Sequence, residues 1–160
     1  MNRTISNLAI AALLAALAGA AAVPAADAAL TGVVGNWQTE PDDGAVGIVQ
    51  ISVDAGGNMQ GRIVGGNHPG LKDLKNPDPA ARAMALRGQL ILRDMKYEGG
   101  GHWSGGTIYR ASNGKTYKCN VTLGADGKLN VRGYIGFALL GSTQDWIRYT
   151  GTSMDLPPAH

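Results

Sequence analysis

Cysteine is almost absent from this chain, which has one cysteine in 160 residues. Because Cys119 has no partner within the chain, no internal disulfide can form, and a packed core or assembly has to supply stability. A lone cysteine in an alternating strand pattern is typical of a small buried hydrophobic residue. No neighbouring His or Lys pattern indicates an activated thiol.

Charge and long apolar runs are also scarce. Charged residues make up 16% of the chain, the formal net charge is +2, and the basic residues are spread out rather than clustered. This pattern gives no reason to expect a nucleic-acid partner. After residue 23 no apolar run is long enough for a membrane span of about 20 residues.

The one long apolar run, residues 8–23, follows Arg3 and precedes Ala26, Asp27 and Ala28. This order is typical of a secretory signal peptide, so we expect cleavage after Ala28, with Ala22 and Ala25 offering nearby sites. A retained membrane anchor is the competing interpretation, but the run is short and rich in Ala. No Cys lies near the junction, so lipidation of a new N-terminal Cys is excluded. We therefore expect a periplasmic or secreted protein without an integral membrane span after cleavage.

The remaining chain of about 130 residues is long enough for one domain with a core and too short for two. We expect a signal peptide over residues 1–28, one domain over residues 29–152 and a flexible tail over residues 153–160.

Short alternating runs separated by Gly, Asn and Asp dominate that domain and predict about eight strands. Lys115 to Leu123 shows the pattern best, because Tyr117, Cys119 and Val121 share one face. Turn residues that tolerate positive φ connect several runs, which favours antiparallel neighbours. An all-β, up-and-down barrel is our preferred prediction, and a two-sheet sandwich is the alternative. The predicted strands cover residues 35–38, 46–53, 59–64, 89–94, 103–110, 115–123, 129–135 and 143–150.

One long connection, residues 67–86, interrupts the strands. Asp78 is a good helix N-cap and Pro79 a good first helical residue, which predicts a short helix over residues 80–86. The connection is expected to plug one end of the barrel, and a lid over a pocket is the alternative.

Trp37 near the start and Trp146 with Arg148 near the end resemble the lipocalin arrangement, in which a first-strand Trp packs against a late Arg. A guanidinium over an indole would contribute about 1 kcal/mol and seal the barrel end. We therefore predict Trp37, Trp146 and Arg148 as structural closure residues.

A string of motifs in one order resembles the bacterial domain-of-unknown-function 2147 family, from Val33 to Tyr149. The resemblance implies an exported protein with a lipocalin-like β-barrel and a role in binding a small molecule, and it brings no catalytic residues. One departure is Arg110, where the family pattern has an acidic residue followed by Pro. The motifs cover residues 61–64, 75–79, 105–109, 113–117, 132–136 and 146–148.

No constellation of residues indicates catalysis, a cofactor or a metal. His68, His102 and His160 are not spaced with another ligand on one strand or helix. The glycines near 99–101 and 105–106 lack the helix and the Gly-Lys-Ser/Thr sequence of a phosphate loop. We expect no enzyme.

Aromatic side chains are the ligand candidates, because a barrel that holds a ligand needs apolar walls with a few polar tips. The alternative is that these rings only fill the barrel or cover its outside. Residues 134–141 are apolar throughout. We expect them to belong to the core, and the second interpretation is an apolar rim at the barrel mouth. The candidates are Trp103, Tyr109, Tyr117, Tyr134 and Phe137, with Tyr117 the strongest.

The sequence thus favours a binding module for a small apolar or amphipathic molecule. A structural or interaction protein with a filled barrel, acting through its surface or as a homodimer, is the alternative, and an enzyme comes third.

Overall fold

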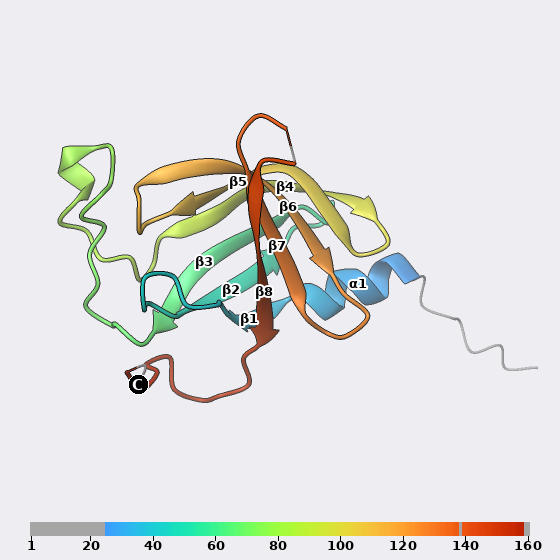
Figure 1. Cartoon of the computed structure of the whole chain (residues 1–160). Coiled ribbons are helices and arrows are strands. Elements are labelled where there is room, and N and C mark those ends of the chain that lie inside the picture. The colour runs from blue at the N-terminus through green and yellow to red at the C-terminus, as the bar shows by residue number, and fades with distance from the viewer. Residues whose placement is uncertain (1–24, 138, 159–160) are drawn as a thin grey trace, which may run out of the picture.

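A computed structural model describes residues 25–137 and 139–158 (Figure 1). This part of the chain forms a closed antiparallel barrel in which each strand pairs with the next and the last pairs with the first, which confirms the predicted fold class. The eight strands are β1 (Gly35–Gln38), β2 (Gly47–Val53), β3 (Met59–Gly66), β4 (Leu90–Gly99), β5 (His102–Arg110), β6 (Lys115–Leu123), β7 (Leu129–Tyr134) and β8 (Gly141–Arg148).

The predicted strands match the observed ones closely except at β4, which continues to Gly99. Asp94 has a φ of 56°, so the backbone bulges and the alternation of inward residues is reset at Met95. Opposite this bulge β5 approaches closely, since a Cβ on Gly106 would lie 2.2 Å from the Arg93 carbonyl oxygen. Only glycine fits there.

One end of the barrel is closed by the helix α1 (Ala25–Val33), drawn in blue in Figure 1. Val33 is fully buried, and its carbonyl accepts a hydrogen bond of 2.8 Å from Trp37 Nε1. Arg148 stacks on the Trp37 ring with its guanidinium carbon 4.0 Å from the ring centroid. The same guanidinium donates to the carbonyls of Gly32 and Val34 at the end of α1. The predicted Trp–Arg pair therefore exists, and it also holds the helix in place.

Trp146 and Trp103 are also fully buried in the core. Trp103 lies next to Tyr97, with ring centroids 4.9 Å apart, and its Nε1 donates to the Gly57 carbonyl in the β2–β3 turn. Burial of three Trp side chains with a hydrogen bond for each indole N–H produces a dry core without a disulfide.

Helix α1 spans the predicted cleavage site after Ala28, and residues 1–24 lie outside the described part. Ala29, Leu30 and Val33 pack on the core, so the segment just after the predicted site belongs to the barrel. At the other terminus, within the segment expected to be a tail, the backbone of residues 154–156 contacts the end of β3. Gly66 exchanges two backbone hydrogen bonds with Met154 and Leu156, because the end of β3 has an unpaired edge there.

The long β3–β4 connection, residues 67–89, contains a three-residue 3-10 helix, η1 (Pro79–Ala81), rather than the predicted helix over 80–86. Asp78 is the N-cap as predicted. The helix ends early because the chain turns back to Leu71, which accepts a hydrogen bond from the Leu86 backbone. A helix this short also gains too few hydrogen bonds to persist on its own.

Candidate functional site

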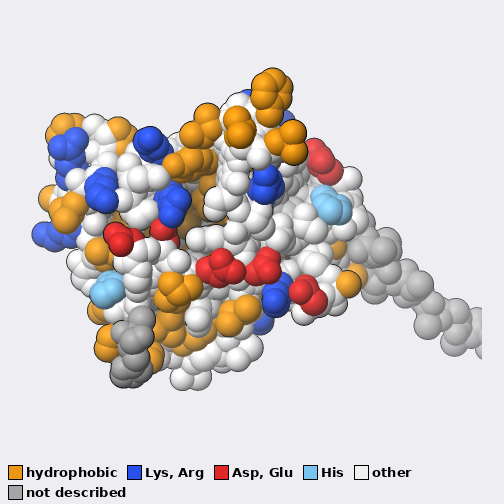
Figure 2. Space-filling view, viewed as in Figure 1, with side chains coloured by type: hydrophobic (Ala, Val, Ile, Leu, Met, Phe, Trp, Pro, Cys, Tyr) orange, Lys and Arg blue, Asp and Glu red, His pale blue; other side chains and the backbone are white. Residues whose placement is uncertain are grey.

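A cavity of about 630 Å³ opens at the barrel end opposite α1. The four connections at this end join β1 to β2, β3 to β4, β5 to β6 and β7 to β8. Figure 2 shows the hollow between the lobe made by the β3–β4 connection and the β7–β8 loop. The wall deeper in the barrel is aliphatic and comes from five strands. Its members are Val49, Ile63, Ile91, Ile108 and Val131.

Three of the predicted ligand residues, Tyr109, Tyr117 and Tyr134, line this cavity. Trp103 does not, because it begins β5 at the closed end and is buried beside Tyr97. Phe137 is not on the cavity wall either, since 79% of the residue is exposed at the tip of the β7–β8 loop. The five aromatic candidates thus divide into a cavity group, a core residue and a surface residue.

Tyr109 connects the cavity wall to the β3–β4 connection. Its hydroxyl donates a 2.6 Å hydrogen bond to Asp73 Oδ1, and Asn76 Nδ2 donates to the other carboxylate oxygen at 2.7 Å. Asp73 is fully buried. Burial, together with this carboxylate, raises the pKa of Tyr109 far above its usual value, so the hydroxyl stays protonated. The bond from Tyr109 holds the connection against β5, and the bond from Asn76 fixes the Asp73 carboxylate within the connection.

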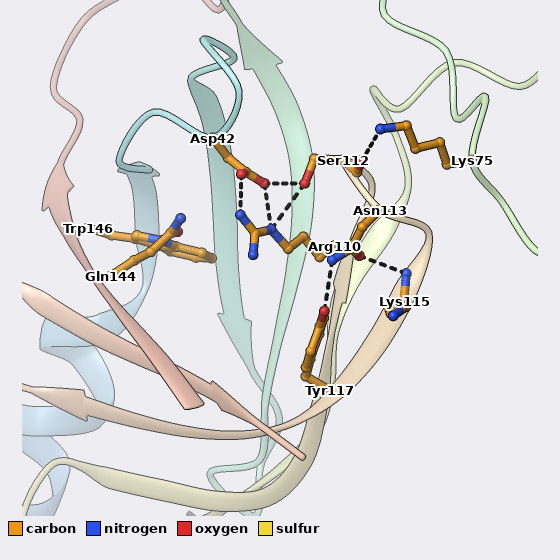
Figure 3. A network of polar contacts seen from close by, with 9 residues as sticks. All are labelled: Asp42, Lys75, Arg110, Ser112, Asn113, Lys115, Tyr117, Gln144 and Trp146. Atoms are coloured by element: carbon orange, nitrogen blue, oxygen red, sulfur yellow. Dashed lines mark hydrogen bonds and ion pairs between the residues drawn. The ribbon is translucent and has the colours of Figure 1, made fainter. Parts of the chain in front are cut away.

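A second polar network crosses the cavity mouth (Figure 3). Arg110 makes two hydrogen bonds to Asp42, 2.9 Å from Nε and 2.5 Å from a terminal nitrogen, and Ser112 donates to the same carboxylate. The hydrogen bonds from Arg110 lower the pKa of Asp42. Lys75 Nζ reaches the Ser112 carbonyl at 2.5 Å. Three of the four mouth connections are therefore linked, and Arg110, the departure from the family pattern, is the central residue.

Two other polar groups face the same space. Asn113 Nδ2 donates to the Tyr117 hydroxyl at 2.8 Å. Gln144 Oε1, on the cavity wall, accepts from Trp146 Nε1 at 2.9 Å. The Tyr117 hydroxyl and the Gln144 amide thus add fixed hydrogen-bonding positions to the aliphatic wall, while the charged residues lie on the connections at the mouth. Apolar walls with a few placed polar groups are the usual composition of a small-molecule site.

The segment 134–141 forms a rim at the cavity mouth. The first interpretation, that this segment belongs to the core, is wrong. Ile135, Phe137, Leu139 and Leu140 are all exposed, while Ile135 and Leu140 also border the cavity. The reason is geometric: β7 and β8 separate after Tyr134, and Gly136 at a φ of 69° turns the loop outward.

The histidines and the cysteine of the described residues are placed as follows. No group of three or more His, Cys, Asp or Glu side chains is placed to hold a metal ion there. Burial raises the pKa of Cys119 to about 12, so the thiolate needed for nucleophilic attack is disfavoured at neutral pH. His68 lies at the mouth, His102 contacts Thr122, and His160 lies outside the described residues.

Sequence reasoning did not single out the mouth residues of the β3–β4 connection. Leu71, Leu74, Lys72 and Lys75 all border the cavity. The order of the turns along the chain could have identified them. In an up-and-down barrel alternate turns lie at the same end, so the 112–114 turn lies at the same end of the barrel as this connection. The same rule places Trp103, which follows the 99–101 turn, at the opposite end.

A closed eight-stranded barrel with one sealed end and a cavity at the other defines a lipocalin-like protein. A solved structure supports this class: the lipocalin-family protein HP1028 from Helicobacter pylori superposes with a TM-score of 0.67 at 24% identity, covering 74% of this chain and 83% of that one. None of the curated proteins matches the chain.

The chain belongs to the family described as uncharacterized protein conserved in bacteria (DUF2147), whose model matches residues 35–148. The match begins at β1 and ends at β8, so it covers the whole barrel. Among the described residues, no helix is both long and apolar enough to cross a membrane.

Proposed function

We propose that this protein binds a small apolar or amphipathic molecule in the cavity at the open end of the barrel. The observation that carries the proposal is the cavity itself, about 630 Å³ in volume, with an aliphatic wall, a few tyrosine and amide groups, and charged side chains from the connections at its mouth. Ligand sites in proteins are typically about 300–1,000 Å³ and have this mixed lining.

The uneven distribution of large side chains along the barrel axis supports the proposal. The three Trp side chains are buried in the core, whereas β7 has a glycine, Gly133, on the cavity wall. A Cβ on Gly133 would already contact Ile108 Cγ2 at 3.3 Å and Tyr117 Cβ at 3.5 Å, so any larger side chain here has to extend into the cavity or displace these neighbours. The barrel is thus filled at one end and left open at the other.

We further propose that the protein is not an enzyme and acts in the periplasm or outside the cell. The first part rests on the sequence, in which no motif or spacing indicates a nucleophile paired with a base. The second is supported by the signal-peptide pattern of residues 1–28. Proteolytic removal of that segment during export, read as the intact mass of the purified protein, tests it.

Displacement of a lipophilic fluorescent dye, together with native mass spectrometry of the purified protein, tests ligand binding. Gly133→Leu adds a side chain inside the cavity and is expected to weaken dye binding roughly tenfold or more. Thr116→Leu is the matched control, because it adds the same side chain at an exposed position on the neighbouring strand β6. Unchanged dye affinity in a folded Gly133→Leu protein would remove the cavity as the site.

The alternative of a filled barrel that acts only through its surface is disfavoured by the cavity. A homodimer stays compatible with the proposal, since the exposed rim lies outside the cavity wall except at Ile135 and Leu140. Sedimentation velocity of the purified protein measures its oligomeric state directly.

A further inference from the structure

Exposed apolar residues are concentrated at one end of this molecule. Within the described chain nine large hydrophobic residues are exposed, and all but Val34 and Ile147 lie in two connections at the open end. Patches of this kind mark interaction sites more often than chance exposure does. The seven are Leu71, Leu74 and Met84 in the β3–β4 connection and Ile135, Phe137, Leu139 and Leu140 in the β7–β8 loop.

The β7–β8 loop does not need these side chains for its own shape. Backbone hydrogen bonds close it, from Leu140 N to Phe137 O at 3.0 Å and from Ile135 N to Leu140 O at 3.2 Å. Phe137 and Leu139 are nevertheless 79% and 91% exposed at its tip. Their hydrophobic surface contributes nothing to the isolated barrel, so its use lies in contact with something else.

The β3–β4 connection adds positive charge beside the apolar residues. Lys72, Lys75, Arg82 and Arg87 are exposed along it. Of its two acidic residues Asp73 is buried and Asp78 caps η1. Figure 2 shows Lys and Arg side chains gathered over this lobe, beside the hydrophobic side chains of the cavity mouth and the upper loop.

Other carboxylates at this end lie in the C-terminal segment, where Asp155 pairs with Arg87 at 3.0 Å, and in the β1–β2 connection. Asp42 is neutralised by its ion pair with Arg110. Glu40 accepts a hydrogen bond from the backbone of Asp145, and Asp43 is exposed. Acidic groups therefore border the other side of the mouth, and the excess of positive charge belongs to the β3–β4 connection.

We propose that the open end of the barrel docks on an anionic lipid bilayer, through a docking face made of the β7–β8 loop and the β3–β4 connection. Phe137 and Leu139 enter the interface between headgroups and acyl chains. The basic residues of this connection that have no ion pair within the described chain, Lys72, Lys75 and Arg82, contact lipid phosphates, while Arg87 is paired with Asp155. Apolar tips with flanking Lys and Arg are the combination that binds such surfaces.

The position of the cavity agrees with this orientation. Ile135 and Leu140 belong both to the exposed loop and to the cavity wall, so the apolar surface runs from the loop into the barrel without a break. A docked barrel would receive an amphipathic molecule from the bilayer without exposing it to water. The docking itself does not depend on ligand binding, and the two proposals can fail separately.

A tryptophan reporter gives the most direct test. The three native Trp residues are buried, so Phe137→Trp introduces an exposed indole at the loop tip, and Ile147→Trp introduces one on the β8 surface as the control. With vesicles of phosphatidylglycerol and phosphatidylcholine containing brominated acyl chains, quenching is expected for Phe137→Trp and not for Ile147→Trp. Equal quenching at both positions, or none at residue 137, would overturn the proposal.

Vesicle co-sedimentation tests the same face by loss of binding. Phe137→Ser with Leu139→Ser is expected to lower the partition coefficient roughly tenfold or more, whereas Ile147→Ser leaves it unchanged. Lys72→Gln with Lys75→Gln is expected to weaken binding to anionic vesicles only, with Lys118→Gln, exposed on β6, as its control. Equal binding by the apolar double variant and wild type would contradict the proposal.

Two further outcomes identify a different occupant. A dimer in sedimentation velocity that disappears in Phe137→Ser with Leu139→Ser, without vesicle binding by wild type, would assign the face to a second copy of this chain. Vesicle binding that is identical with and without phosphatidylglycerol would refute the electrostatic part.

Discussion

The two ends of this barrel use similar residues for opposite purposes. At the closed end α1, Trp37 and Arg148 exclude water and satisfy one another's polar groups. At the open end tyrosines and aliphatic residues surround a cavity, and polar contacts bind the connections to one another rather than fill the space. The barrel therefore separates its sealed core from its cavity along its axis, and substitutions at the two ends should have different effects.

Trp37→Ala is expected to have the largest effect on stability. It removes a fully buried indole and the surface on which Arg148 stacks, so the free energy of unfolding should fall by about 3–5 kcal/mol. Tyr134→Ala at the open end should cost about 1 kcal/mol or less and instead weaken dye binding. Urea denaturation of both variants measures the contrast, and equal losses would show that the two ends are not separate.

Tyr109→Phe tests the anchor between the cavity wall and the β3–β4 connection. It leaves one oxygen of the buried Asp73 carboxylate without its donor, so we expect a loss of about 1–3 kcal/mol. Tyr117→Phe is the matched control, since it loses only an exposed hydrogen bond from Asn113. The same denaturation midpoint for both variants would refute the anchor.

Arg148→Ala should lower the free energy of unfolding by about 1–2 kcal/mol, because it removes the cation–π contact and the contacts to the end of α1. Arg148→Lys keeps the charge but cannot reproduce the planar stack, so it should recover only part of the loss. Lys118→Ala, on the outer face of β6, is the control for removing an exposed cation. An unchanged denaturation midpoint for Arg148→Ala would contradict the placement.

The smallest effect is the pH dependence of the mouth network. Because Arg110 lowers the pKa of Asp42 in the folded protein, their pairing stabilises the fold above the ordinary carboxyl pKa of 3.8 and is lost as the pH falls below it. Asp42→Asn should therefore cost about 0.5–1 kcal/mol at pH 7 and nothing near pH 2. Asp43→Asn is the control. A difference that persists at low pH would indicate a role other than charge.

Much of this architecture was predictable from period-two alternation and turn residues, because each strand has one apolar face and short connections. The bulge at Asp94 was not, since nothing in a sequence window signals a positive φ at an aspartate. Helix α1 was missed because its Ala-rich residues continue the composition of the apolar run before them. Contacts with β2 and β6, which only the closed fold provides, make it part of the barrel.

The candidate site was predictable in residue type more than in position. Alternation identified Tyr117 as inward-facing, and the cavity includes it. The same alternation cannot tell Trp103 from Tyr109, because depth along the barrel depends on which turns share an end. The partnership of Tyr109 with Asp73 joins residues 36 positions apart, a separation that local patterns do not reach.

One consequence follows from how the barrel is joined to itself. β1 and β8 share two residue pairs, Trp37 with Arg148 and Gln38 with Ile147, whereas the β6–β7 ladder has six. This seam is the shortest ladder in the ring, and it lies directly above the Trp37–Arg148 stack. A barrel with one short seam can widen there while its other ladders stay intact. Widening at this seam would change the girth of the cavity, and under the proposed binding function it would let molecules of different cross-section share one site.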